Sequence, residues 1–104
     1  MNNAIRYQKL LSNDGARAFL AKSYGLELLF ILQECERNLA DNGIDDSYDL
    51  LIYLKPRRAA FSSHINVLEA NGHIIKAVSE KKASKSVLRI SANVRKAFNE
   101  FTSS

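Results

Sequence analysis

Basic residues gather at two places in the second half of the chain, and their side chains are suited to binding a polyanion. The first place is residues 55–58, where three cations surround Pro56, and the second holds Lys81, Lys82 and Lys85. Ammonium and guanidinium groups donate charge-assisted hydrogen bonds to phosphate oxygens, and a guanidinium can also read the edge of guanine. The two clusters therefore indicate contacts with phosphates along a nucleic acid.

Charge is unevenly distributed along the 104 residues. Residues 1–54 hold five Lys or Arg against eight Asp or Glu, a net charge of −3, whereas residues 55–104 hold ten against three, a net charge of +7. A basic surface of this kind favours polyanions, and the phosphates of a duplex are the usual ones. The alternative is that these Lys and Arg side chains only solvate an outer face.

The composition, with 46% hydrophobic and 25% charged residues, is that of an ordinary globular protein. The length suits one hydrophobic core, so we expect a single domain over residues 1–104. No apolar run reaches the roughly 20 residues that cross a bilayer, and the first residues do not read as a signal peptide. We therefore expect a cytoplasmic protein with no membrane partner.

Other kinds of chemistry have little support in the sequence. The single cysteine excludes an internal disulfide, and with His64 and His73 it makes no spacing typical of a zinc site. Cys35 lies at helical spacing from Leu28 and Leu39, which predicts a buried structural thiol. Because the chain has no glycine-rich phosphate loop, nucleophile elbow or HExxH helix, we expect no enzyme, no metal and no cofactor.

Apolar periodicity and turn residues predict six helices and two strands. Asn and Gly within 12–15 break the first helix and offer a new cap, Lys55-Pro56 makes a corner, and Gly72 provides a left-handed cap. Ile44 is expected to add a bridging residue to the sheet, and Tyr48 and Tyr53 to be core residues of one helix. The predicted helices span 4–11, 16–22, 26–39, 46–54, 57–71 and 92–101, and the predicted strands 73–79 and 87–90, joined by a polar loop over 80–86.

From residue 46 onward this order of elements is the outline of a winged helix-turn-helix. We therefore predict an α+β fold, mainly helical, with a small antiparallel β-hairpin as the wing.

The stretch Ala59–Ile74 resembles the recognition helix of winged-helix transcriptional regulators, especially the MarR-like group. Its last part matches that group's Leu-Glu-x-x-Gly-x-Ile exit into the wing, and the resemblance covers roughly residues 46–101. The resemblance implies that Lys81, Lys82 and Lys85 occupy the wing. It also implies a major-groove face made of Arg57, Arg58, Ala59, Ser62, Ser63 and Asn66.

These residue types agree with groove binding. Small side chains let a helix sit deep in the major groove, and Asn66 has the amide that can pair with adenine. The alternative interpretation of Ser62 and Ser63 is that they are solvated helix residues with no role in binding. His64 adjoins the expected buried stripe and is expected to be a packing residue rather than a base contact or a pH sensor.

The function predicted from these features is sequence-specific binding of double-stranded DNA by a homodimeric transcriptional regulator, a repressor, with no particular small-molecule effector indicated. The dimer is expected to form through the terminal helices, about 4–22 and 92–101, because the apolar faces that carry Phe19, Leu20, Phe98 and Phe101 would otherwise be only partly covered. Two alternatives stay open. One is a winged-helix protein-interaction module, and the other is a plasmid or phage centromere-binding segregation protein.

Overall fold

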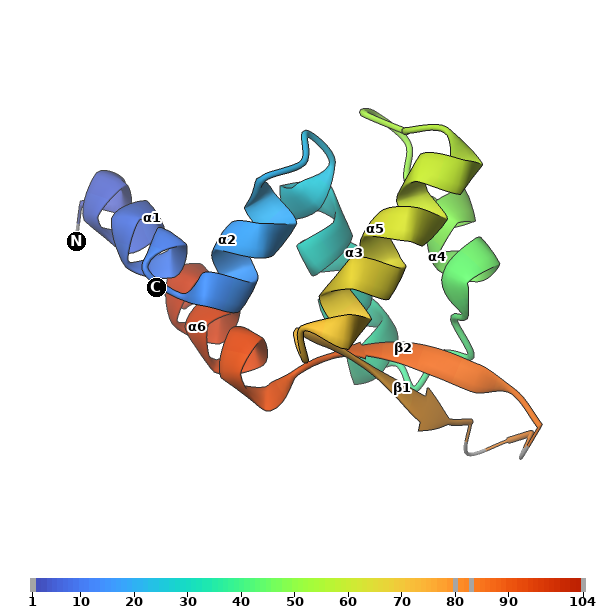
Figure 1. The fold of residues 1–104 in the computed structure, drawn as a ribbon. Coiled ribbons are helices and arrows are strands. Elements are labelled where there is room, and N and C mark those ends of the chain that lie inside the picture. Colours follow the sequence, from blue (N-terminus) through green and yellow to red (C-terminus); the bar gives the residue numbers. More distant parts are fainter. Residues whose placement is uncertain (1, 80, 83, 104) are drawn as a thin grey trace.

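Six helices and one antiparallel hairpin make up the part of the chain that the computed structural model describes, residues 2–79, 81–82 and 84–103 (Figure 1). The mainly helical α+β class predicted from the sequence is confirmed. Glu80 and Ala83 of the predicted loop lie outside the described residues. The elements are α1 (Asn3–Leu11), α2 (Asp14–Leu20), α3 (Gly25–Arg37), α4 (Ile44–Leu50), α5 (Arg58–Ala70), β1 (Ile74–Val78), β2 (Ser86–Ile90) and α6 (Ala92–Thr102).

Three helix ends follow the capping residues that the sequence offered. The side chain of Asn13 accepts a hydrogen bond from the Ala16 N–H at 2.9 Å, which begins α2, and Ser91 does the same for α6 at Val94. Gly72 has a φ of 78° and ends α5 with the left-handed turn that glycine adopts without strain. These three signals place α2, α5 and α6 within one or two residues of their predicted bounds.

The core is one cluster to which α1, α2, α3, α5, α6 and both strands contribute buried side chains. α3 contains Leu28, Leu29 and Leu32, which are fully buried, and it contacts α2, α4 and β2. The two strands pair in antiparallel register, with Ile74 opposite Ile90, and both of these side chains face the core. α3 is therefore the central helix, as its apolar residues on more than half of the circumference predicted.

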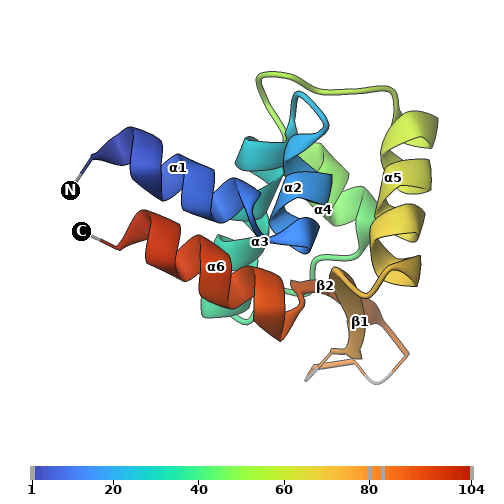
Figure 2. The same ribbon diagram turned by 60° about the vertical axis from the view of Figure 1, so that its left-hand side comes forward.

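The first and last helices lie side by side and run in opposite directions, so that the two ends of the chain are close together (Figure 2). The α1–α6 pair projects from one side of the molecule, while α5 lies on the other side (Figures 1 and 2). The terminal segments are thus separated in space from the predicted recognition helix.

The predicted helix over 46–54 begins two residues too late and is wrong at its end, four residues too far along the chain. α4 begins at Ile44 after Gly43 and stops at Leu50, because Leu51 turns into extended geometry with ψ of 135° and buries its side chain. The carboxylate of Glu27 on α3 then accepts the Ile52 N–H at 2.9 Å, which satisfies the backbone outside a helix. Tyr53 is consequently 85% exposed rather than a core residue.

Ile44 does not join the sheet, which has two strands in the described residues. The contact with the sheet comes two residues earlier, where the Asn42 carbonyl accepts a hydrogen bond from the Leu88 N–H at 2.9 Å. α3 also ends before the Asp41–Gly43 segment expected to stop it. Leu39, two residues after the end of α3, has the left-handed φ of 52°, and the following Ala40 N–H donates to the Cys35 carbonyl.

Replacement of Gly25 by Ala is expected to destabilise the fold by about 1–3 kcal/mol, since an added methyl group would overlap the backbone carbonyl of Phe19. Gly43→Ala is the matched control, because the atom nearest to its added carbon, the Ser86 carbonyl oxygen, is 3.5 Å away. Urea unfolding of both variants measures the difference, and the Gly43 variant should stay within about 0.5 kcal/mol of the parent. Equal stability of the two variants would contradict this packing of α2 on α3.

Candidate nucleic-acid interface

α5 presents a buried stripe and an opposite face of small residues. Phe61, Ile65 and Leu68 are buried at spacings of four and three, as predicted. Because successive helical residues turn by about 100°, Ser63 and Asn66 project from the opposite side. Ser62 is only half-exposed at the edge of this face. The exposed residues of α5 that the prediction omitted are Ala60, Val67 and Ala70.

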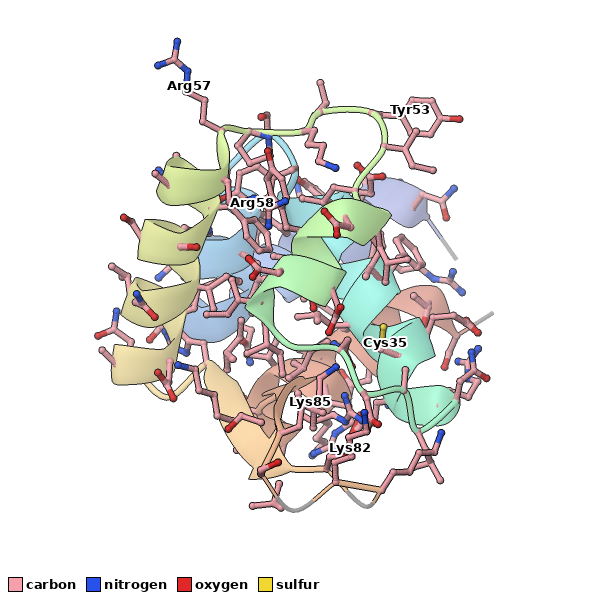
Figure 3. The ribbon with its side chains drawn as sticks, turned by 90° about the vertical axis from the view of Figure 1, so that its right-hand side faces the viewer. Cys35, Tyr53, Arg57, Arg58, Lys82 and Lys85 are labelled. Carbon is pink, nitrogen blue, oxygen red and sulfur yellow. The ribbon has the colours of Figure 1, made fainter. Side chains whose placement is uncertain are left out.

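Arg57 caps the start of α5 with its backbone and leaves its side chain in solvent. Its φ of −66° and ψ of 147° are extended, and its carbonyl accepts the first helical hydrogen bond from Phe61 at 3.0 Å. Figure 3 shows the guanidinium pointing away from the protein. No acidic side chain within the described residues forms an ion pair with it.

Arg58 lies between α4 and α5 instead of on the outer face (Figure 3). Its guanidinium donates to Asp45 at 2.8 Å and to Asp49 at 3.2 Å, and it lies 4.5 Å from the centre of the Tyr48 ring. The hydrogen bond to Asp45 is the main cause that raises the pKa of Arg58. The residue predicted to face the groove is therefore engaged by α4, although about half of its side chain is still exposed.

The hairpin carries Lys81 and Lys82 at its tip, and both side chains are exposed. The Ser79 hydroxyl accepts hydrogen bonds from the backbone N–H groups of Lys81 and Lys82, each at 3.1 Å, and donates one to Asp41. The backbone at the two lysines is thus tied to the end of β1. The loop holds their ammonium groups in solvent at the edge of the sheet.

Lys85 occupies the same loop but has a partner. Its ammonium group lies 3.0 Å from the Asp46 carboxylate on α4. The hydrogen bond from Lys85 holds the pKa of Asp46 below its ordinary value, with the Gly43 N–H as the second cause. The three predicted hairpin lysines therefore differ, since only Lys85 is held by an acidic residue among those that the structure describes.

Many of the basic side chains counted in residues 55–104 form hydrogen bonds or ion pairs with other residues of the chain. The sequence predicted no particular role for Arg89, yet it donates to the Asn42 side chain at 2.6 Å and to the Ala40 carbonyl at 2.8 Å. Lys76 pairs with Glu69, and Arg95 pairs with Glu36. With Arg58 and Lys85 also paired, the free cations near α5 and the hairpin are fewer than the sequence suggested. Within the described chain, the cations there that form no ion pair are Lys55, Arg57, Lys81 and Lys82.

His64 faces the interior, which confirms its interpretation as a packing residue. Its Nδ1 lies 3.0 Å from the Tyr24 hydroxyl, and the ring meets the Tyr24 ring edge-on at 5.8 Å between centroids. Burial lowers the pKa of His64, so the neutral imidazole is favoured in the folded chain. His64 is thus unavailable to the outer face of α5.

Sequence reasoning missed an exposed apolar loop between α4 and α5. Ile52, Tyr53 and Leu54 are 72%, 85% and 57% exposed, beside Lys55. The available signal was the unbroken run Leu50–Leu54, because five consecutive apolar residues cannot all lie on one face of a helix. Lys55 itself lies over the Tyr48 ring at 4.5 Å from its centre.

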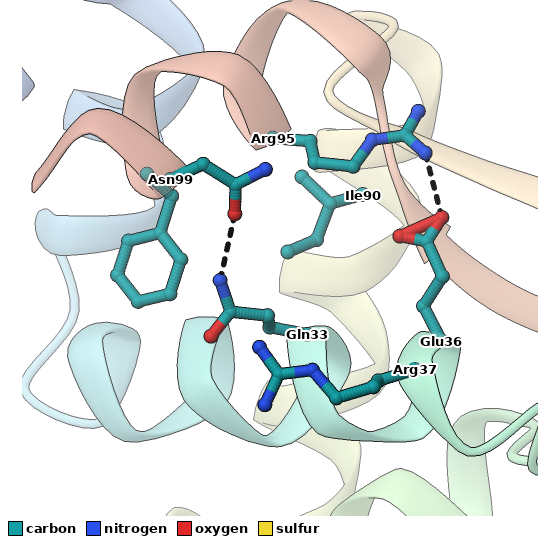
Figure 4. A pocket seen from close by; sticks show the side chains of 7 residues that line it. Gln33, Glu36, Arg37, Ile90, Arg95 and Asn99 are labelled. Atoms are coloured by element: carbon teal, nitrogen blue, oxygen red, sulfur yellow. Dashed lines mark hydrogen bonds and ion pairs between the residues drawn. The ribbon is translucent and has the colours of Figure 1, made fainter. Parts of the chain in front are cut away.

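A cavity of about 260 Å³ opens between α3 and α6 (Figure 4). Gln33 donates to Asn99 at 2.8 Å and Arg95 donates to Glu36 at 2.7 Å across it. Arg37, on its rim, pairs with Glu34 of the same helix. Its charged side chains thus have partners within the described residues, and the cavity offers no free charge to a ligand.

Other candidate sites are not supported. Cys35 is buried, and desolvation is the main cause that raises the pKa of its thiol, as expected of a structural cysteine. Within residues 2–79, 81–82 and 84–103 there is no metal-ligand group of three or more His, Cys, Asp or Glu. No helix of the described chain is long and apolar enough to cross a membrane. Comparisons with protein-family models, curated proteins and solved structures gave no match.

Proposed function

We propose that this chain binds double-stranded DNA as a winged-helix protein, with α5 as the recognition helix and the β1–β2 hairpin as the wing. The observation that carries the proposal is the outer face of α5. Among the described residues this face has no acidic side chain, since Glu69 is half-buried and paired with Lys76. Arg57 lies at one end of it, and Figure 3 shows Lys82 and Lys85 of the hairpin below α4, away from Arg57.

The shape and chemistry of this face suit the major groove. Ala59 and Ser63 are short, so the helix backbone can approach the base edges, and Asn66 offers an amide donor and acceptor. Arg57 can reach a phosphate or a guanine, and Lys81 and Lys82 extend from the hairpin toward the backbone of the duplex. By the resemblance to winged-helix regulators, we propose that the role is transcriptional repression by a homodimer.

A second function has one observation in its favour. The exposed Ile52, Tyr53 and Leu54 form an apolar surface of the kind that binds another protein. Retention on heparin and on random duplex separates the two, because only DNA binding predicts strong retention that falls steeply with salt. A centromere-binding segregation protein would bind duplex in the same way.

Replacement of Arg57 and Arg58 together by Ala is expected to weaken DNA binding by about tenfold or more without unfolding the chain, since it removes charge-assisted hydrogen bonds to DNA at the start of α5. On random duplex, most of this effect should appear in Arg57→Ala alone, because Arg58 is engaged by α4. Arg17→Ala on α2 is the control for removal of an exposed arginine. Unchanged affinity in a folded double variant would remove α5 from the interface.

Replacement of Lys81, Lys82 and Lys85 by Ala should lower the affinity for every sequence, with most of the effect on random duplex from Lys81 and Lys82, because Lys85 is paired with Asp46. These lysines are expected to bind phosphates, so the slope of log affinity against log salt should flatten by about 0.9 for each phosphate that is no longer neutralised. The variant Lys9→Ala with Lys22→Ala and Lys96→Ala removes the same charge elsewhere and should have a smaller effect. A changed consensus with an unchanged slope would count against a phosphate-binding hairpin.

The proposed dimer requires a surface at the terminal helices, and the structure changes the residues expected there. Phe19 and Phe98 are fully buried within one chain, so they are not free for an interface. Among the described residues near this end, Ile5, Tyr7 and Phe30 are exposed apolar side chains, at 51%, 40% and 45%. Tyr7 packs edge-on against Phe101, and Phe30 packs against Phe98.

Sedimentation at micromolar concentration should show a dimer, and Ile5→Asp should convert it to a monomer by placing a charge in the interface. Ile52→Asp makes the same change at the opposite end and should leave the dimer intact. Two recognition helices should then lie roughly 34 Å apart on DNA. A monomer in solution with one chain per site on DNA would defeat the dimer proposal.

A further inference from the structure

The three aspartates of α4 hold cations from both of the basic elements beside it. Asp45 and Asp49 hold Arg58 of α5 at 2.8 and 3.2 Å, and Asp46 holds Lys85 of the hairpin at 3.0 Å. In Figure 3, α4 lies in front with Arg58 beside it and Lys85 below it. One short acidic helix thus pairs with cations from both ends of the proposed DNA-binding surface.

In these ion pairs, another anion can replace the aspartate as the partner of the cation. The aspartate side chains are 78%, 63% and 53% exposed for Asp45, Asp49 and Asp46. Exposed ion pairs contribute little to stability because water and salt screen them. A duplex presents phosphates at far higher charge density, and release of its counterions adds to the attraction. Duplex phosphates can therefore compete with Asp45 and Asp49 for Arg58.

We propose that the α4 aspartates compete with DNA phosphate for Arg58 and Lys85, and so weaken binding to duplex of arbitrary sequence. This inference rests on the proposed DNA binding. Without exchange, only the free cations near α5 and the hairpin contact phosphate. After exchange, Arg58 and Lys85 also contact phosphate. At the specific DNA site, the close fit between the α5 outer face and the base pairs compensates for the broken ion pairs. The aspartates thereby increase the discrimination between specific and random sites.

The structural alternative is that these pairs only fix α4 against its neighbours. Arg58 also lies over Tyr48, whose hydroxyl donates to the Pro56 carbonyl, so this cluster joins α4 to the loop before α5. If the pairs act only in this way, their removal lowers stability and does not strengthen DNA binding. The two accounts thus predict opposite changes in affinity.

The test uses Asp45→Asn with Asp49→Asn in the full chain and a labelled random-sequence duplex as the probe. Affinity at low salt should rise by roughly tenfold, and the salt slope should steepen by about 0.9, because the released Arg58 neutralises one more phosphate. Asp46→Asn, which releases Lys85, should steepen the slope by a similar amount. Circular dichroism confirms folding, and the near-identical shape of Asn and Asp favours it.

A matched control distinguishes the local release of Arg58 from the change in net charge of the whole chain. Asp14→Asn with Glu34→Gln removes two acidic charges and frees Arg17 and Arg37, both on helices outside the proposed interface. This control should raise the affinity for random duplex much less. In an Arg58→Ala background, the Asp45 and Asp49 changes should have no local effect, because the cation that they release is gone.

Three results would overturn the inference. One is unchanged or weaker binding by the folded Asp45 and Asp49 variant. Another is an equal increase in affinity in the Asp14 and Glu34 control, which would assign the effect to net charge. The third is an undiminished increase in the Arg58→Ala background. Absence of salt-dependent duplex binding by the parent chain and by every variant would overturn the proposed function itself, and this inference with it.

Discussion

Packing of Phe61 between two tyrosines fixes the position of α5, and the proposed interface depends on that contact. The Phe61 ring lies 5.8 Å from the Tyr24 ring, just before α3, and 5.3 Å from the Tyr48 ring on α4. With Ile65 and Leu68 buried on the same stripe, α5 has one possible inward face. Helical geometry then directs Ser63 outward and leaves Arg57 at the exposed start of the helix.

The same packing brings the acidic first half of the chain against the basic second half. The sequence shows this only as a contrast of −3 and +7, which suggests one broad basic surface. In the folded chain, Arg58 and Lys85 meet α4, and Arg95 meets Glu36 on α3. Near α5 and the hairpin, the described cations without an ion pair lie at the start of α5 and at the tip of the hairpin. Charge is thus concentrated at defined positions instead of spread over a face, which suits contacts at separate points on a duplex.

The features that local sequence determines could be predicted. Caps at Asn13, Ser91 and Gly72 depend on a few neighbouring residues, and the α5 stripe depends on periodicity. Features that depend on distant residues could not be. α4 ends at Leu50 because Leu51 enters the core and Glu27 of another helix accepts the next N–H. Likewise, Asp45 and Asp46 resemble ordinary first-turn acids, and nothing local identifies Arg58 and Lys85 as their partners.

The exposed loop beside Arg57 links the two functions considered for this chain. Tyr53 and Leu54 are three or four residues from Arg57, and the Tyr48 hydroxyl binds the Pro56 carbonyl between them and α5. A protein bound to this loop would therefore cover the start of α5, where the proposed DNA contacts begin. DNA and such a partner would compete for one end of the molecule. The α1–α6 pair on the other side stays accessible to a second copy of the chain in either case.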